Sequence, residues 1–327
     1  FYFDNMFSHC PGIKKFPSIS TSNALSLSGL FMYTQLTEAP ELDTSNVIDM
    51  SHMFNECFYL TEIPDYDTTN VSNFAGMFYH TKIKKLPPNF NVSNGENFSG
   101  MFQYATIDTI DTVLDTSKAT DMSYMFYESY LREIPEGFVI PSTCTDINGL
   151  FYNTQVRGTL PMSDFSNITS MCSAFAEGLS FSQEEFNTIN CKSFGEAFRG
   201  NASFKKITLD ITSVENDPEY YSSYQGLGST FTSCHNLTEV YLKGIPSKPF
   251  SMRHTFNYCK QLTKVTSDVA TLKPTDMSYA FEKCTILETI PNIDFSECTR
   301  VTGMFYDCNK LKNNIEQERK NFCSHKM

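Results

Sequence analysis

Apolar residues recur along the chain at a regular interval, marked by a phenylalanine that follows Met, Leu, Ala or Thr. The thirteen copies of this anchor are Phe7, Phe31, Phe54, Phe78, Phe102, Phe126, Phe151, Phe175, Phe198, Phe231, Phe256, Phe281 and Phe305. Neighbouring anchors are 23 to 25 residues apart, except for one step of 33 residues after Phe198. A fixed period of this length predicts a stack of repeats.

The first half of each repeat has the apolar spacing of a helix. In the copy around Phe54, the residues Val47, Met50, Phe54 and Cys57 are spaced by 3, 4 and 3, which is the interval of one helical face. This spacing predicts a short helix. An aspartate recurs before the helix and is predicted to cap its first N–H groups. These aspartates are Asp43, Asp67, Asp115, Asp164 and Asp294.

The second half of each repeat is predicted to be a short strand. Leu60 and Ile63 precede Pro64, and the same pattern recurs in other copies. Short apolar runs cut by proline are typical of brief strands, here one per repeat, each pairing in parallel with the next copy. A lone repeat cannot bury its apolar side, whereas stacked copies share one core. The sequence therefore predicts an α/β repeat solenoid, with the anchor phenylalanines stacked inside it.

The repeats define the expected domain organisation. We expect one solenoid over residues 1–311 that begins within a repeat and carries an insertion near residues 210–226. Residues 312–327 leave the pattern and are predicted to form a C-terminal cap or a linker. Because the chain begins within a repeat, a fragment or a processed form is expected, and an upstream signal or anchor stays open.

Charge and composition narrow the classes of partner. The net charge of −12 argues against nucleic acid, which needs a basic surface. With 40% hydrophobic residues the chain resembles a folded soluble protein. No apolar run reaches the length of a membrane helix.

The motifs themselves resemble a known family. The segments LDTSNVIDMSHMF and FEKCTILETIPNIDFSECTRVTGMFYDCNKL resemble the leucine-rich-repeat-like surface-protein repeats of the BspA type. The resemblance extends from about Phe3 to Leu311. It implies a leucine-rich-repeat-like right-handed superhelix of about 13 repeats, an adhesive role on cell surfaces, and no catalytic residues. Similar repeats also occur in phage-encoded proteins.

Cysteine and histidine positions give no sign of a metal or catalytic site. Six of the eleven cysteines lie three residues after an anchor, where other copies have Thr, Ser or Ala. This pattern indicates small buried thiols, although disulfides between stacked copies stay open as the alternative. The sequence has no paired C-x-x-C spacing and no G-x-S-x-G motif. We therefore expect no metal, no cofactor and no enzymatic activity.

Two groups of residues are candidates for ligand binding. The long step after Phe198 combines acidic residues with tyrosines, which anchor many interfaces. Its candidates are Glu215, Asp217, Glu219, Tyr220, Tyr221 and Tyr224. The second group consists of exposed pairs beside the core leucine of each strand. Its candidates are Lys84, Lys85, Lys205 and Lys206.

Together these features predict a non-enzymatic extracellular repeat scaffold for adhesion. We expect a protein or glycan ligand on a cell or host surface, and self-assembly stays open. One alternative is a structural or receptor-binding protein of a phage particle. Another is an intracellular protein-interaction scaffold, which reduced cysteines would favour.

Overall fold

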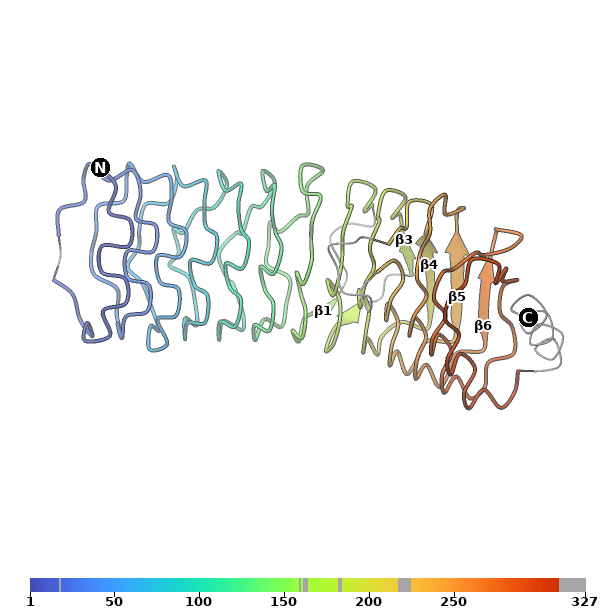
Figure 1. The fold of residues 1–327 in the computed structure, drawn as a ribbon. Coiled ribbons are helices and arrows are strands. Elements are labelled where there is room, and N and C mark those ends of the chain that lie inside the picture. The colour runs from blue at the N-terminus through green and yellow to red at the C-terminus, as the bar shows by residue number, and fades with distance from the viewer. Residues whose placement is uncertain (18, 159, 161–163, 182–183, 217–224, 312–327) are drawn as a thin grey trace. The chain divides into compact units, whose positions relative to one another are not determined.

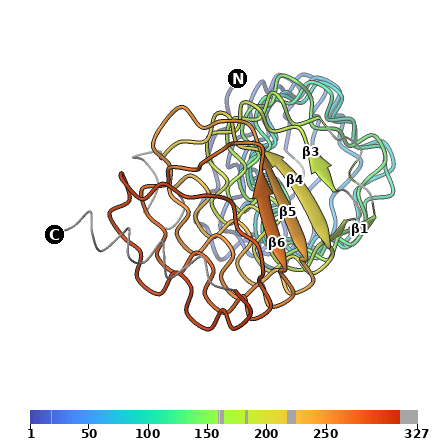
Figure 2. The ribbon, with the colours of Figure 1, turned by 90° about the vertical axis from the view of Figure 1, so that its right-hand side faces the viewer.

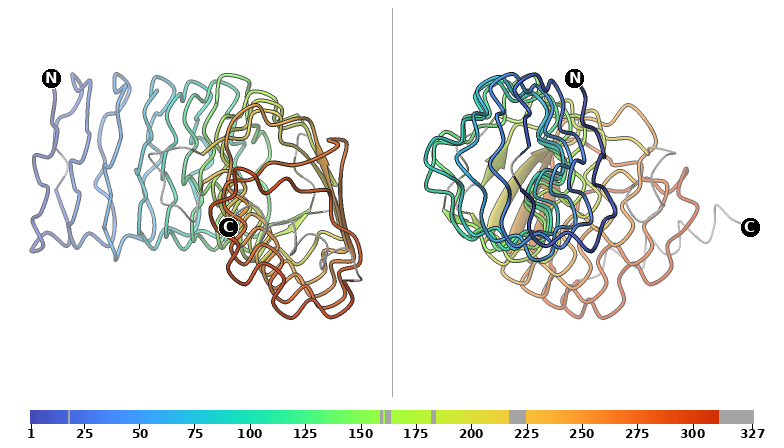
Figure 3. Two further views of the ribbon diagram at one scale, coloured as in Figure 1. Left: turned by 45° about the vertical axis from the view of Figure 1, so that its right-hand side comes forward. Right: turned by 90° about the vertical axis from the view of Figure 1, so that its left-hand side faces the viewer.

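The computed structural model describes residues 1–311 except 18, 159, 161–163, 182–183 and 217–224. The predicted cap or linker, residues 312–327, lies outside the described residues. The chain divides into two compact units, Phe1–Met162 and Ser163–Met327, which are called the N-terminal and C-terminal units. In each unit every repeat forms one coil, and Figure 3 shows the coils of the N-terminal unit following one another. A coil contacts only its neighbours. That residues 1–311 form one continuous solenoid stays a prediction.

The predicted helix is replaced by a series of tight turns. Alternate amides bond within the coil and to the next coil: Met53 N–H donates to Met50 O (3.2 Å), whereas Phe54 N–H donates to Met77 O (3.1 Å). His52 and Glu56 have left-handed φ values of 55° and 60°, which a right-handed helix cannot contain. The described residues contain no helix. The apolar spacing identified the buried side chains correctly, but it could not reveal hydrogen bonds to a neighbouring coil.

The anchor phenylalanines stack as predicted. In the N-terminal unit the rings from Phe7 to Phe151 lie 5.5–6.2 Å apart between centroids, with planes tilted by 3–16°. In the C-terminal unit the rings from Phe175 to Phe305 lie 5.2–5.8 Å apart. The apolar residue four positions before the anchor is also fully buried in most copies, as Met50 and Phe74 illustrate. One ring per coil therefore forms a continuous core within each unit.

Parallel strands form mainly in the C-terminal unit. β3 (Glu185–Phe186), β4 (Lys206–Asp210), β5 (Glu239–Lys243) and β6 (Lys264–Ser267) make one parallel sheet in that order, as Figures 1 and 2 show. The described residues also include the two-residue strands β1 (Arg157–Gly158) and β2 (Ser180–Phe181).

Proline limits the predicted strand in copies such as the one around Phe54. The N-terminal unit has single bridges such as Glu38 with Glu62 where the strands were predicted. Pro64 stands two residues after Glu62, and proline has no N–H with which to extend a ladder. β4 and β5 contain no proline, so their ladders reach five residues.

The recurring aspartates cap turns as predicted. Asp43 Oδ1 accepts hydrogen bonds from the Ser45 backbone N–H (3.2 Å) and hydroxyl (2.7 Å). The equivalent aspartates 67, 115, 164 and 294 accept from the amide two residues later at 2.8–3.0 Å. The Ser45 side-chain and backbone bonds lower the pKa of Asp43. A carboxyl group whose pKa is lowered on folding stabilises the folded state at pH values above its unfolded pKa. This stabilisation is lost as the pH falls through its folded pKa.

The 33-residue step does not interrupt the core. Val47 and Met50 are three positions apart in a regular copy, whereas their equivalents Val214 and Leu227 are thirteen apart. Val214 and Leu227 are both buried, and the rings of Phe198 and Phe231 stack at 5.6 Å. The predicted insertion therefore lies between Val214 and Leu227.

Truncating one ring of the stack should destabilise the protein strongly. We expect Phe126→Ala to cost about 3–5 kcal/mol of unfolding free energy, because a fully buried ring leaves a cavity. Denaturant unfolding followed by circular dichroism measures this loss. Tyr130→Ala is the control from the same coil, since Tyr130 is 55% exposed, and it should stay within about 0.5 kcal/mol of the parent. Equal losses in the two variants would contradict the ring-stack account.

Candidate binding surfaces

The outer face of the sheet β3–β6 presents two rows of polar side chains. One row is Lys206, Glu239 and Lys264, which face one another in register. Lys206 Nζ lies 3.1 Å from Glu239 Oε1, and both side chains are about half exposed. Such exposed ion pairs contribute little to stability. Their groups can therefore exchange partners with a ligand at little cost to the fold.

The second row of the sheet face is less charged and contains an aromatic ring. Glu185 pairs with Thr208, Thr208 with Tyr241, and Tyr241 with Thr266. Tyr241 is 38% exposed, while Val240 and Leu242 on either side of it are buried in the core. Side chains of both rows line a shallow hollow of about 170 Å³. The sheet face therefore combines hydrogen-bonding groups, both charge signs and one aromatic ring.

The predicted lysine pairs are exposed. Lys205 precedes β4 and Lys206 belongs to it, so the structure places Lys206 in the charged row of the sheet face. Lys84 and Lys85 are exposed in the N-terminal unit, outside any strand. The sequence located these four side chains on the surface, but only Lys206 is placed in a row with other candidate contacts.

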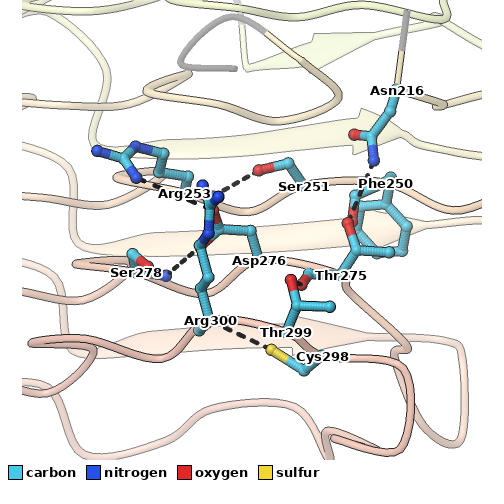
Figure 4. Close-up of polar contacts among 10 residues, drawn as sticks. All are labelled: Asn216, Phe250, Ser251, Arg253, Thr275, Asp276, Ser278, Cys298, Thr299 and Arg300. Carbon is cyan, nitrogen blue, oxygen red and sulfur yellow. Dashed lines mark hydrogen bonds and ion pairs between the residues drawn. The ribbon is translucent and has the colours of Figure 1, made fainter. Parts of the chain in front are cut away.

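The insertion begins at residues held by the surrounding coils. Glu215 accepts a hydrogen bond from Lys248 Nζ, and its other oxygen lies 3.2 Å from Lys192 Nζ. These lysines, Lys248 first, lower the pKa of the Glu215 carboxyl. Asn216 Nδ2 donates to Thr275 Oγ1 at 3.2 Å, as Figure 4 shows. Glu215 thus fixes the start of the insertion. The other candidates Asp217, Glu219, Tyr220, Tyr221 and Tyr224 lie outside the described residues.

A charged cluster in the same unit surrounds Asp276 (Figure 4). Its Oδ2 lies 3.9 Å from Arg253 Nη1 and 3.8 Å from Arg300 Nη1. Its Oδ1 accepts a hydrogen bond from the Ser278 N–H at 2.8 Å. Asp276 is only 8% exposed, and equivalent residues such as Asp49 bond the amide two positions later in the same way. The position is therefore structural, with two arginines balancing a buried carboxylate.

The C-terminal unit also contains a groove of about 500 Å³. Residues 245–250, 269 and 271–273 line most of it, together with Glu297. Its lining combines exposed Ile245 with prolines and lysines, and it includes neither histidine nor cysteine. The groove has the size of a ligand site, but its lining provides no nucleophile paired with a base.

An aromatic surface in the N-terminal unit was not found from the sequence. The residues two positions after the first six anchors form what is here called the outer column: His9, Tyr33, Glu56, His80, Tyr104 and Glu128. The His9 and Tyr33 rings stack at 4.5 Å, and the Tyr104 ring lies 5.5 Å from His80. His80 Nδ1 lies 3.3 Å from Glu56 Oε2.

Tyrosines one position after the anchors lie beside the outer column. Tyr79 and Tyr127 approach Tyr104 edge-on at 5.6 and 5.7 Å. Burial and, to a lesser degree, Glu56 raise the pKa of Tyr79. A search for tyrosines at fixed offsets from the anchors would have revealed this surface, because the signal is present in the repeat itself.

The cysteines are structural hydrogen-bond donors. Cys57 Sγ donates to Phe31 O of the preceding coil at 3.1 Å, and the equivalents Cys234, Cys259, Cys284 and Cys308 do the same at 2.9–3.1 Å. None of the ten cysteines in the described part of the chain forms a disulfide. The interpretation as small buried thiols is confirmed for Cys57, Cys234, Cys259 and Cys284, whereas Cys308 is half-buried. Burial raises the pKa of Cys57 to about 11 and that of Cys144 to about 12.

Two searches of the described residues gave negative results. They contain no group of three or more His, Cys, Asp or Glu side chains that could hold a metal ion. Among them, no helix has the length and apolar character needed to span a membrane.

Comparison with known protein families identifies the repeat. The family model described as "Mycoplasma protein of unknown function, DUF285" matches residues 2–109, 25–135, 145–222 and 225–324. The chain belongs to this family. One family model that matches four times along the chain is typical of a repeat protein. These matches agree with the resemblance to BspA-type repeats. No curated protein matches the chain.

Similar solved structures are leucine-rich repeat proteins. One is from Eubacterium ventriosum, with 17% identity, a TM-score of 0.40, and coverage of 85% of this chain and 84% of that one. Another is from Bacteroides ovatus, with 14% identity, a TM-score of 0.40, and coverage of 98% of this chain and 85% of that one.

The free thiols lead to a prediction for this DUF285 chain. We expect the ten described cysteines to titrate as thiols after unfolding without reductant. In the native protein near pH 8, Cys57 and Cys144 should react slowly, because a raised pKa keeps the thiol protonated below that value. Ellman titration in native and denaturing buffer measures both quantities. An increase in thiols after reductant treatment would contradict the free-thiol account.

Proposed function

We propose that this repeat protein is a non-enzymatic scaffold outside the cell that binds a protein or glycan ligand. The observation that supports this most is the outer face of the sheet β3–β6, with Lys206, Glu239 and Lys264 in one row and Tyr241 in the other. Interfaces are enriched in tyrosine, because its ring buries apolar area while its hydroxyl forms hydrogen bonds. The mixed charges suit a ligand that is not a polyanion.

The shape of the sheet face supports a macromolecular ligand. Its hollow of about 170 Å³ is smaller than typical small-molecule pockets, which occupy about 300–1,000 Å³. A broad polar surface with a shallow hollow suits a protein or glycan chain that lies across several strands. No residue on the two rows forms a nucleophile–base pair, which supports a binding role over catalysis.

The free thiols support a second candidate, an intracellular interaction scaffold. Cytosolic proteins keep cysteines reduced, whereas secreted proteins often oxidise them. The described cysteines form no disulfide, and nearly all are buried. Brief protease treatment of intact producing cells separates the two proposals. Cleavage of the chain under these conditions supports the surface location, whereas protection until lysis supports the intracellular one.

Altering the sheet face should abolish ligand binding without unfolding the protein. We expect Tyr241→Ala combined with Lys264→Glu to weaken binding at least about 30-fold, the effect of losing a central contact. Binding to immobilised extracellular-matrix proteins and neutral glycans measures the change. Lys82→Glu is the charge control, because Lys82 is exposed in the N-terminal unit. Parent-like binding by the double variant would contradict the role of the sheet face.

The insertion can be tested separately. Removing residues 217–224 keeps Glu215 with its lysine partners and Asn216 with Thr275. Because loop-closure entropy changes slowly with length, we expect unfolding free energy to change by about 1 kcal/mol or less. Ligand affinity should fall if Asp217, Glu219 and the three tyrosines form contacts. Unchanged affinity in the same binding assay would remove the insertion from the proposed binding surface.

A further inference from the structure

The outer column of the N-terminal unit combines aromatic rings with carboxylates and lacks lysine and arginine. Tyr33 is followed in the next coil by Glu56, and Tyr104 is followed by Glu128. No Lys or Arg occurs at either of the two positions after an anchor in this unit. Tyr33 is 41% exposed. All of these residues have left-handed φ values of 52–60°, so each side chain leaves its coil from the same kind of turn.

The C-terminal unit shows what occupies a tyrosine at this position. Tyr258 stands two residues after its anchor, and the next coil has Lys283 there instead of a glutamate. Lys283 Nζ lies 4.3 Å from the centroid of the Tyr258 ring and donates to its hydroxyl at 2.5 Å. The same chain also places Lys82 Nζ 5.6 Å from the Tyr59 ring in the N-terminal unit. A tyrosine on this scaffold therefore accepts an ammonium group from a neighbouring residue.

The outer column has the rings without the lysine. Where Lys283 would stand beside Tyr258, the copies after Tyr33 and Tyr104 have carboxylates. A cation over either ring would thus have a counter-charge in the adjacent coil. Cation–π attraction and an ion pair would act on the same ammonium group. The net charge of −12 would also attract a basic partner over longer distances.

We propose that the outer column binds lysine or arginine side chains of a basic protein segment. One cation lies over the Tyr33 ring beside Glu56, and another over the Tyr104 ring beside Glu128. At the first position the ligand ammonium replaces His80 as the partner of Glu56, which now lies 3.3 Å from His80 Nδ1. This proposal rests on the proposed binding function, but it uses a surface of the N-terminal unit rather than the sheet face.

The test measures binding of a fluorescent peptide of alternating lysine and serine to the whole chain. We expect Tyr33→Leu combined with Tyr104→Leu to weaken binding about tenfold, or about threefold for each ring. Tyr33→Phe combined with Tyr104→Phe keeps both rings and should bind like the parent. Tyr306→Leu makes the same change at a tyrosine of the C-terminal unit that is 64% exposed and lies outside both surfaces, and it should have no effect. Thermal unfolding confirms that each variant is folded.

Modified peptides distinguish a cation from other ligands. The trimethyl-lysine peptide keeps its charge and should bind, whereas the acetyl-lysine peptide should not. Parent-like binding by the double leucine variant would overturn the proposal, because attraction to the net charge alone would then explain the affinity. Binding of soluble neutral polysaccharide without binding of the lysine peptide would also overturn it. The sheet-face ligand is absent from this assay, so failure of the proposed sheet-face function does not change the result.

Discussion

The hydrogen bonds between successive coils are the constraint on which the rest of the structure depends. Every second amide of the Met-Phe segment donates to the next coil, so its neighbours must close tight turns within their own coil. The turns impose left-handed φ values on residues such as His52 and Glu56. They also direct the anchor phenylalanine inward, and it is buried in every copy except the first and the last, where Phe7 and Phe305 are half-buried. The ring stack and the outer column are both consequences of this backbone pattern.

The same constraint explains what the sequence could predict. The period and the anchors gave the stacked coils, the buried rings and the capping role of Asp43, because these features depend on residues within one repeat. The helix was wrong because 3, 4, 3 spacing marks buried positions equally well in a run of turns. A single repeat does not reveal that the Phe54 N–H bonds to the next coil. Proline limits the length of the strand in the copy around Phe54, and Pro64 already indicated in the sequence where that ladder stops.

The candidate surfaces were predicted less completely. Exposed lysines such as Lys206 could be located from their position beside core residues, but their partners come from register across strands. Glu215 looked like a ligand contact in the sequence and is held by Lys192 and Lys248 in the structure. The outer column was not predicted, because its positions carry no core residue and the spacing of the anchors does not mark the tyrosines two positions further on. Repeat positions that carry no core residue therefore need to be compared between copies in the same way as the anchor positions.

The inter-coil hydrogen bonds of the Met-Phe segment give each coil a direction, since in this segment its donors point toward the following copy and its acceptors toward the preceding one. Any coil therefore presents the same donor and acceptor edges as any other. Duplication or loss of one 24-residue segment in the gene would leave matching edges on both sides of the junction. The number of coils can consequently change during evolution without compensating substitutions in the backbone contacts. Surface residues such as those of the outer column are then free to diverge from copy to copy.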